Sequence, residues 1–143
     1  MGHLAVIDSE RGKIRNKEHV PTKDFSGLRY GKITPTDIDG GVEFNDKVFV
    51  FIELKYRNAV IKTGQRLFLE RLCDALEVAG KVAIVLMSRY QTTGDTIVDV
   101  APLPVSDFRM KGEWHKPKKE ITIRQAIDEI LTWHPAPKDN KKE

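Results

Sequence analysis

A strongly apolar segment, residues 48–52, constrains the fold of this chain more than any other feature of the sequence. Its five residues, Val-Phe-Val-Phe-Ile, are all β-branched or aromatic, which is typical of a strand covered on both faces. Asn45 and Asp46, just before it, form a strong turn signal. The sequence therefore predicts a β-hairpin made of residues 37–44 and 47–56.

The remaining elements define the fold class. Residues 63–79 carry one apolar stripe at helical spacing, which contains Cys73, and Gly80 is placed to end this helix. The other predicted elements are a strand candidate at 27–33, a buried strand at 81–89, a shorter strand at 96–100 and a helix at 122–133 that opens with a capping box. We therefore expect an α/β fold, with a central mixed β-sheet flanked by helices.

Length and composition limit the classes of protein to which the chain can belong. Its 143 residues fit one domain, expected over residues 1–137, with a disordered tail at 138–143. A single cysteine excludes an intrachain disulfide and a four-thiolate zinc site. The apolar runs are too short to cross a bilayer, and the first residues show no signal-peptide pattern. We expect an intracellular protein with no membrane partner.

The net charge of +3 is unevenly distributed along the chain. Residues 10–32 and 107–119 carry a net positive charge, whereas residues 37–57 carry a net negative charge. Such a pattern suits a site that holds a polyanion between basic margins and needs carboxylates at its centre. Ordinary solvated loops would give the same pattern.

Two charged residues interrupt the apolar character of the strand predicted at 47–56. Glu53 and Lys55 are two positions apart, so both side chains leave the same face of the strand. Burial of unpaired charges is costly, so these groups should be paired or bound to a metal ion. The plainer alternative is an ion-pair cluster at the end of the strand, with Asp37 and Arg57 as neighbours.

The register of the predicted hairpin decides which aspartates join this pair. A two-residue loop places Ile38 opposite Glu53 and turns Asp39 to the other face of the sheet. A three-residue loop places Asp39 opposite Glu53 and Asp37 opposite Lys55, with opposed Cβ atoms about 5 Å apart. A bulge at the Gly-Gly pair that follows Asp39 would have the same effect. We predict that one of these two routes gathers the carboxylates on one face.

Such a cluster is suited to a particular kind of chemistry. Two carboxylates and a backbone carbonyl present hard oxygen ligands, which suit Mg²⁺ or Mn²⁺. A magnesium site usually keeps several waters and accepts a substrate phosphate as a further ligand. Lys55 could orient an attacking water or stabilise the charged transition state. The cluster therefore predicts metal-dependent hydrolysis of a phosphate ester.

The spacing of these residues resembles the catalytic motif of the PD-(D/E)xK nuclease superfamily. Asp39 is followed, after thirteen residues, by Glu53-Leu54-Lys55, and the likeness extends over about residues 36–72. The resemblance implies a restriction-endonuclease-like core, metal binding by Asp39, Glu53 and the Leu54 carbonyl, and Lys55 as the catalytic lysine. Asp37 is a candidate second carboxylate.

Two further positions follow from the same resemblance. Several branches of the superfamily place a glutamine on the helix after the motif, and Gln65 could match it; an exposed residue of the first turn is the alternative. The family often also has a glutamate on an N-terminal helix. Glu10 and Glu18 are the candidates here, although neither lies in a convincing amphipathic helix.

Basic side chains near the motif are candidates for contact with DNA phosphates, with plain surface charge as the alternative for each. They are Arg29, Lys32, Arg57, Lys62 and Arg66. Trp114, in the second basic segment, either stacks on a base or packs on the body of the protein.

The function expected from this resemblance is a Mg²⁺-dependent, structure-selective DNA endonuclease. Among small single-domain members, the chain looks most like the Holliday junction resolvases, which implies a homodimer that acts on four-way junctions. Leu67, Phe68 and the last helix are candidate dimer surfaces, with ordinary core as the alternative. A nuclease for flap, linear or repair substrates, and a non-catalytic DNA-binding module of the same fold, remain the alternative functions.

Overall fold

The computed structural model describes residues 21–94 and 96–135 of the chain. The chain divides into two compact units, residues 1–35 and 36–143, and each is described by itself. The predicted C-terminal tail lies outside the described residues, and a single domain over residues 1–137 stays a prediction. No helix in the described ranges is long and apolar enough to cross a membrane.

The described part of the first unit contains a 3₁₀ helix, η3 (Ser26–Leu28), and a tight turn. The Tyr30 N–H donates to the Ile33 carbonyl (2.8 Å), and the Ile33 N–H donates to the Tyr30 carbonyl (2.9 Å). Gly31 has a φ of +63°, a left-handed conformation that a residue without Cβ adopts at no steric cost. The strand predicted at residues 27–33 is therefore wrong, because the chain reverses direction inside it.

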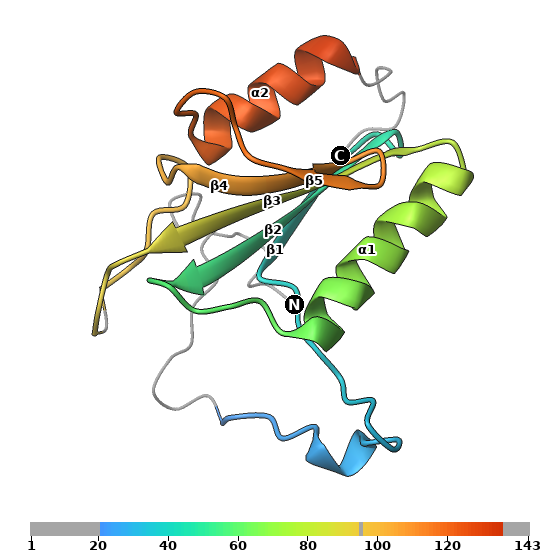
Figure 1. Ribbon diagram of the computed structural model, residues 1–143, viewed down its shortest axis with the longest axis vertical. Coiled ribbons are helices and arrows are strands. Elements are labelled where there is room, and N and C mark those ends of the chain that lie inside the picture. The colour runs from blue at the N-terminus through green and yellow to red at the C-terminus, as the bar shows by residue number, and fades with distance from the viewer. Residues whose placement is uncertain (1–20, 95, 136–143) are drawn as a thin grey trace, which may run out of the picture. The chain divides into compact units, whose positions relative to one another are not determined.

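The second unit is an α/β fold built on a mixed five-stranded sheet with the order β1-β2-β3-β4-β5. Strands β2 and β3 are parallel, and the other neighbouring strands are antiparallel. Figure 1 shows that α1 and α2 lie on opposite sides of this sheet, which confirms the predicted class. The bounds are β1 (Gly40–Phe44), β2 (Val48–Tyr56), α1 (Thr63–Val78), β3 (Val82–Tyr90), β4 (Val105–Met110), β5 (Glu113–His115) and α2 (Ile123–Trp133).

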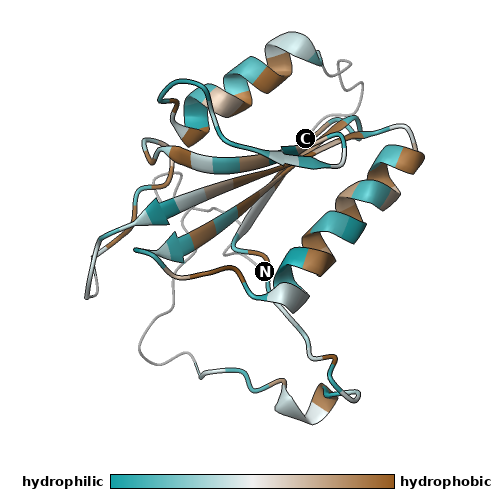
Figure 2. Ribbon diagram, viewed as in Figure 1, coloured by the Kyte–Doolittle hydropathy of each residue, from teal (hydrophilic) through white to brown (hydrophobic). Residues whose placement is uncertain are grey.

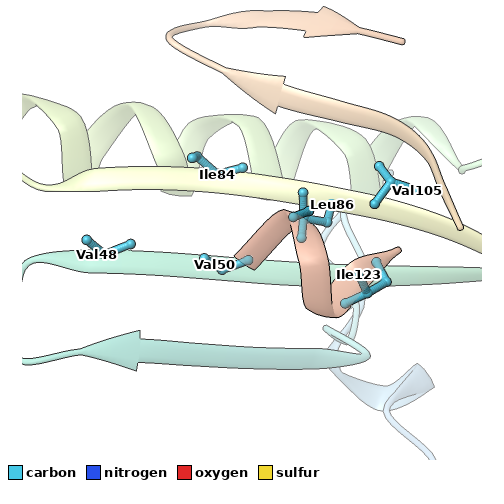
Figure 3. Close-up of a cluster of buried hydrophobic side chains, with 7 residues drawn as sticks. Val48, Val50, Ile84, Leu86, Val105 and Ile123 are labelled. Carbon is cyan, nitrogen blue, oxygen red and sulfur yellow. The ribbon is translucent and has the colours of Figure 1, made fainter. Parts of the chain in front are cut away.

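The two helices cover two separate hydrophobic clusters because side chains alternate between the faces of β2 and β3. On the α2 side, Val48, Ile84 and Ile123 belong to one buried cluster, whose side chains Figure 3 shows along β2, β3 and the start of α2. On the α1 side, Val85 packs with Cys73. Burial raises the pKa of the Cys73 thiol to about 11, so this cysteine belongs to the core, as the apolar stripe predicted. Along both helices, apolar and polar residues alternate in short bands (Figure 2), as in amphipathic helices.

The C-terminal part of the sheet differs from the prediction. Residues 96–100 form no strand where they are described, and Ile97 is 63% exposed. The sheet is instead extended by β4 and β5, joined at Lys111 (φ +51°) and Gly112 (φ +80°). Two positive φ angles give a turn that matches the twist of hairpin strands. The hairpin was missed because charged and apolar residues mix along β4, which then looks like a basic loop.

The start of α2 provides a test of local stability. The predicted capping box is confirmed: the Gln125 N–H donates to Thr122 Oγ1 (3.1 Å), and the Thr122 N–H donates to Gln125 Oε1 (3.0 Å). Replacing Thr122 with alanine should lower the free energy of unfolding by about 1 kcal/mol. Thr122→Ser keeps the hydroxyl and is the control. Equal urea midpoints for the two variants would contradict the role of the cap.

Candidate active site

The candidate site depends on the register of the β1–β2 hairpin. Gly40 pairs with Ile52 and Phe44 pairs with Val48, with no irregularity between them. The connection is therefore the three-residue loop, and the bulge is not used. Asn45 (φ +49°) and Asp46 (φ +62°) make this loop possible, because short polar side chains tolerate the left-handed conformation.

This register brings Asp39 to Glu53. The hydrogen-bonded ladder between β1 and β2 ends at Gly40. Beyond it, the Asp39 side chain continues the pairing, because its Oδ2 accepts a hydrogen bond from the Leu54 N–H at 2.7 Å. A carboxylate thus replaces a backbone carbonyl as the partner of β2. The strand predicted to begin at residue 37 begins at Gly40, and Asp37 is exposed beyond the end of the ladder rather than paired with Lys55.

Glu53 is a buried carboxylate whose hydrogen-bonding capacity is unused. Its side chain is 1% exposed. Lys55 Nζ lies 3.0 Å from Oε2, an ion pair without hydrogen-bond geometry, and neither carboxylate oxygen has a hydrogen-bond partner in the described part of the chain. Buried polar atoms without partners are rare in folded proteins, and a bound ion is one recognised reason for them.

The environment of Glu53 makes its charged form costly. Burial raises its pKa to about 7; Lys55 opposes the shift, and the neighbouring Asp39 carboxylate adds to it. A cation at this position would favour the ionised form. Glu53 and Asp39 are therefore the two carboxylates of the site that could hold a divalent cation.

Gln65 faces Lys55 from the first turn of α1. Its side chain is 8% exposed, so it is not the exposed first-turn residue of the alternative reading. Lys55 Nζ donates to Gln65 Oε1 at 2.6 Å while it contacts Glu53 on the other side. The lysine ammonium is therefore held between an amide oxygen and a carboxylate. Glu53, Lys55 and Gln65 are joined by these contacts, and the Asp39 carboxylate, bonded to the Leu54 N–H, lies near enough to raise the pKa of Glu53.

The basic candidates are less closely associated with this cluster. Arg57 lies with its guanidinium carbon 4.9 Å from the centre of the Tyr56 ring, and Lys62 is exposed at the N-cap of α1. Arg66 forms an ion pair with Glu70, at 3.1 Å. Their roles in DNA binding stay predictions.

Four predicted residues belong to the first unit and not to the unit that contains the site. Arg29 and Lys32 lie in the first unit, where both are exposed and Arg29 Nε donates to the Gly31 carbonyl at 2.8 Å. The N-terminal acidic candidates Glu10 and Glu18 lie outside the described residues.

A polar network under α1 was not predicted. Arg109 on β4 is 5% exposed, and its Nη2 lies 2.8 Å from Asp74 Oδ1. Trp114 Nε1 on β5 donates to Glu70 Oε2 at 2.6 Å, and this same carboxylate pairs with Arg66. Trp114 therefore packs on the body of the protein, the second of its two predicted roles. The Lys111-Gly112 pair, interpreted as the turn of a hairpin, could have placed Arg109 and Trp114 on strands.

Substitution of Trp114 tests this network. Trp114→Phe keeps an aromatic ring but removes the donor to Glu70, and a hydrogen bond to a charged group contributes about 1.5–3 kcal/mol. We expect the free energy of unfolding to fall by about 2 kcal/mol. Trp133→Phe, at a position that is 74% exposed, is the matched control. Urea denaturation checks the difference; two variants of equal stability would show that the bond contributes nothing.

The geometry of the cluster formed by Asp39, Glu53, Lys55 and Gln65 is the basis for any functional assignment. It combines two carboxylates and a lysine at one end of the β1–β2 hairpin with a glutamine from α1, and the Glu53 oxygens accept no hydrogen bond from the described residues. Within the described residues, no group of three or more His, Cys, Asp or Glu side chains is placed to hold a metal ion. Comparisons of the chain with family models, with curated proteins and with solved structures found no match.

Proposed function

We propose that this chain is a metal-dependent DNA endonuclease that hydrolyses phosphodiester bonds, with the restriction-endonuclease-like core of the PD-(D/E)xK nucleases. The observation that carries the proposal is Glu53, a buried carboxylate without hydrogen-bond partners in the described part of the chain, beside Asp39 and Lys55. The neighbouring Asp39 carboxylate makes the charge of Glu53 still more costly, and a cation bound between the two would offset that cost.

The residues present fit a Mg²⁺ or Mn²⁺ ion. Asp39, Glu53 and the Leu54 carbonyl would hold it, and all three offer hard oxygen ligands. Magnesium is usually held by one or two carboxylates, with waters and substrate phosphates as its other ligands, so two carboxylates are sufficient. When bound, such an ion neutralises charge on the phosphate and lowers the pKa of a bound water.

Lys55 and Gln65 supply the remaining functions of the site. The Lys55 ammonium adds positive charge beside the carboxylates, where it would donate to the attacking water or to a phosphate oxygen. Gln65 accepts from Nζ and thereby fixes the position of the ammonium. The burial of Gln65 limits the alternative positions of both side chains.

Within this class we propose a junction resolvase that acts as a homodimer on four-way DNA junctions. The five-stranded second unit leaves little surface for reading a long base sequence, so recognition of DNA shape is favoured. Phe68 on α1 is 45% exposed and offers an apolar surface to a second copy of the chain. Basic side chains around the site would contact the phosphates.

The proposal is tested by incubating the protein with labelled four-way junction, flap, linear duplex and single-stranded DNA, in Mg²⁺ and in excess chelator. We expect Mg²⁺-dependent cleavage, lowered about a hundredfold or more by Asp39→Asn and by Glu53→Gln. Cleavage that survives both substitutions would overturn the site. Symmetric nicks confined to junctions select the resolvase, cleavage of flaps or duplex selects another nuclease, and binding without cleavage favours a non-catalytic module.

A further inference from the structure

A partly exposed group of aromatic and basic side chains, with Tyr90 half-buried, begins one residue beyond Lys55. Tyr56 and Tyr90 occupy paired positions at the ends of β2 and β3, with ring centroids 5.5 Å apart and an angle of 55° between the ring planes. The guanidinium carbon of Arg57 lies 4.9 Å over the Tyr56 ring. We call these three residues the Tyr–Arg cluster. None of them takes part in the contacts that join the candidate active site.

The backbone that carries this cluster is fixed by hydrogen bonds. The Arg57 N–H donates to the Tyr90 carbonyl at 2.9 Å. Arg89 Nη1 donates to the carbonyl of Arg57 at 2.9 Å and to that of Ala59 at 2.6 Å. Arg57 itself has a φ of +51°, which is uncommon for a residue with a side chain. The turn after β2 therefore presents Arg57 and Tyr56 on a braced backbone rather than on a loose loop.

The composition and exposure of the cluster suit one class of ligand. Tyr56 is 37% exposed, and Arg57 is exposed as well. Aromatic rings and arginine guanidinium planes are the groups on which proteins stack nucleobases. Such stacking tolerates any base sequence, but it requires a base that is free of the duplex stack.

The Tyr–Arg cluster lies at the same end of β2 as Lys55 of the candidate site. Successive residues of a strand point to opposite faces, so Tyr56 leaves β2 on the face opposite Lys55, at the same end of the strand. Arg57 follows directly. A DNA strand with one phosphate at Lys55 would have to pass around the end of β2 to bring a neighbouring base to Tyr56.

We propose that Tyr56, Tyr90 and Arg57 form a binding site for an unpaired nucleobase of the DNA strand. The location of the phosphate at Lys55 rests on the proposed nuclease function, whereas stacking of the base does not. The site implies that the preferred substrate has unpaired nucleotides beside the cleaved bond, as in an opened branch point, rather than an intact duplex.

Binding of an oligothymidylate and of an abasic oligomer with the same number of phosphates tests this site. Full-length Glu53→Gln protein in chelator binds each fluorescein-labelled oligomer without cleaving it, and anisotropy gives the two Kd values. We expect the oligothymidylate to bind about tenfold more tightly than the abasic oligomer. This comparison uses an unaltered cluster, so it does not depend on whether any further variant folds.

Three variants then assign the difference to the cluster. Tyr56→Leu keeps apolar bulk without a ring and should abolish the preference for the oligothymidylate, while Tyr56→Phe should keep it. Trp133→Leu, which removes an exposed aromatic on α2, should also keep it. Equal binding of the two oligomers, or a preference that persists in Tyr56→Leu, would overturn the proposal.

The two proposals fail separately. Mg²⁺-dependent cleavage with equal binding of the oligothymidylate and the abasic oligomer would remove the base site and leave the nuclease. A base preference that depends on Tyr56, without any cleavage by the wild-type protein, would remove the nuclease and leave the base site.

Discussion

Glutamine at position 53 should stabilise the fold at neutral pH even though it removes the proposed activity. Burial raises the pKa of Glu53 from 4.5 to about 7. A carboxyl whose pKa is higher in the folded state contributes stability below its unfolded pKa and loses it as the pH rises through the folded pKa. The wild-type free energy of unfolding should therefore fall between pH 4.5 and about pH 7, by up to about 3 kcal/mol.

Denaturation in urea across this pH range, in metal-free buffer, measures the effect. Glu53→Gln keeps the shape of the side chain without its charge, so its stability should lack this fall and should exceed that of the wild type above pH 7. Added Mg²⁺ should then stabilise the wild type more than the variant, because the variant keeps Asp39 but lacks one of the two carboxylates that would hold the ion. Parallel stability curves for the two proteins would show that burial of Glu53 carries no cost.

Removal of the Lys55 ammonium is expected to cost about a hundredfold or more in the rate of DNA cleavage. Lys55→Met keeps the length and apolar character of the side chain but removes the cation that lies 3.0 Å from Glu53 Oε2. The nearby carboxylates then lack positive charge from the protein at the point where the phosphate would bind. Single-turnover cleavage of the best substrate in Mg²⁺ measures the loss.

A second variant separates the charge of Lys55 from its position. Gln65→Leu removes the oxygen that accepts from Lys55 Nζ at 2.6 Å but keeps the lysine and its charge. The expected loss of rate is therefore smaller than in Lys55→Met. An unchanged rate in Lys55→Met would exclude the lysine from the reaction. A loss in Gln65→Leu that matched that of Lys55→Met would mean that the glutamine acts in its own right.

The parts of the fold with strong local patterns could be predicted from the sequence. The β-branched run at 48–52, the stripe of α1 and the Thr122 capping box each gave the correct element. The strand predicted at 96–100 is wrong because these residues pair with no strand: Val100 packs on the core, whereas Ile97 is exposed. The β4–β5 hairpin was hidden because pairing with β3, rather than local propensity, makes β4 a strand.

The central residues of the site were predictable to the extent that strand geometry fixes them. Glu53 and Lys55 share a face in any strand, but the position of Asp39 depended on a loop length that Asn45 and Asp46 leave open. The Leu54 N–H donates to the Asp39 carboxylate instead of to a backbone carbonyl, and no pattern in the sequence predicts this bond. The burial of Arg109 likewise follows from long-range pairing.

The most direct test of the central claim compares two aspartates of the same segment. Asp39 accepts from the Leu54 N–H beside Glu53, whereas Asp37 is exposed beyond the end of the hairpin ladder. In Mg²⁺-dependent cleavage of labelled branched DNA, Asp39→Asn should lower the rate by about a hundredfold or more, and Asp37→Asn should cost much less. A wild-type rate in Asp39→Asn, or equal losses in the two variants, would contradict the claim that Asp39 and Glu53 form a metal-dependent nuclease site.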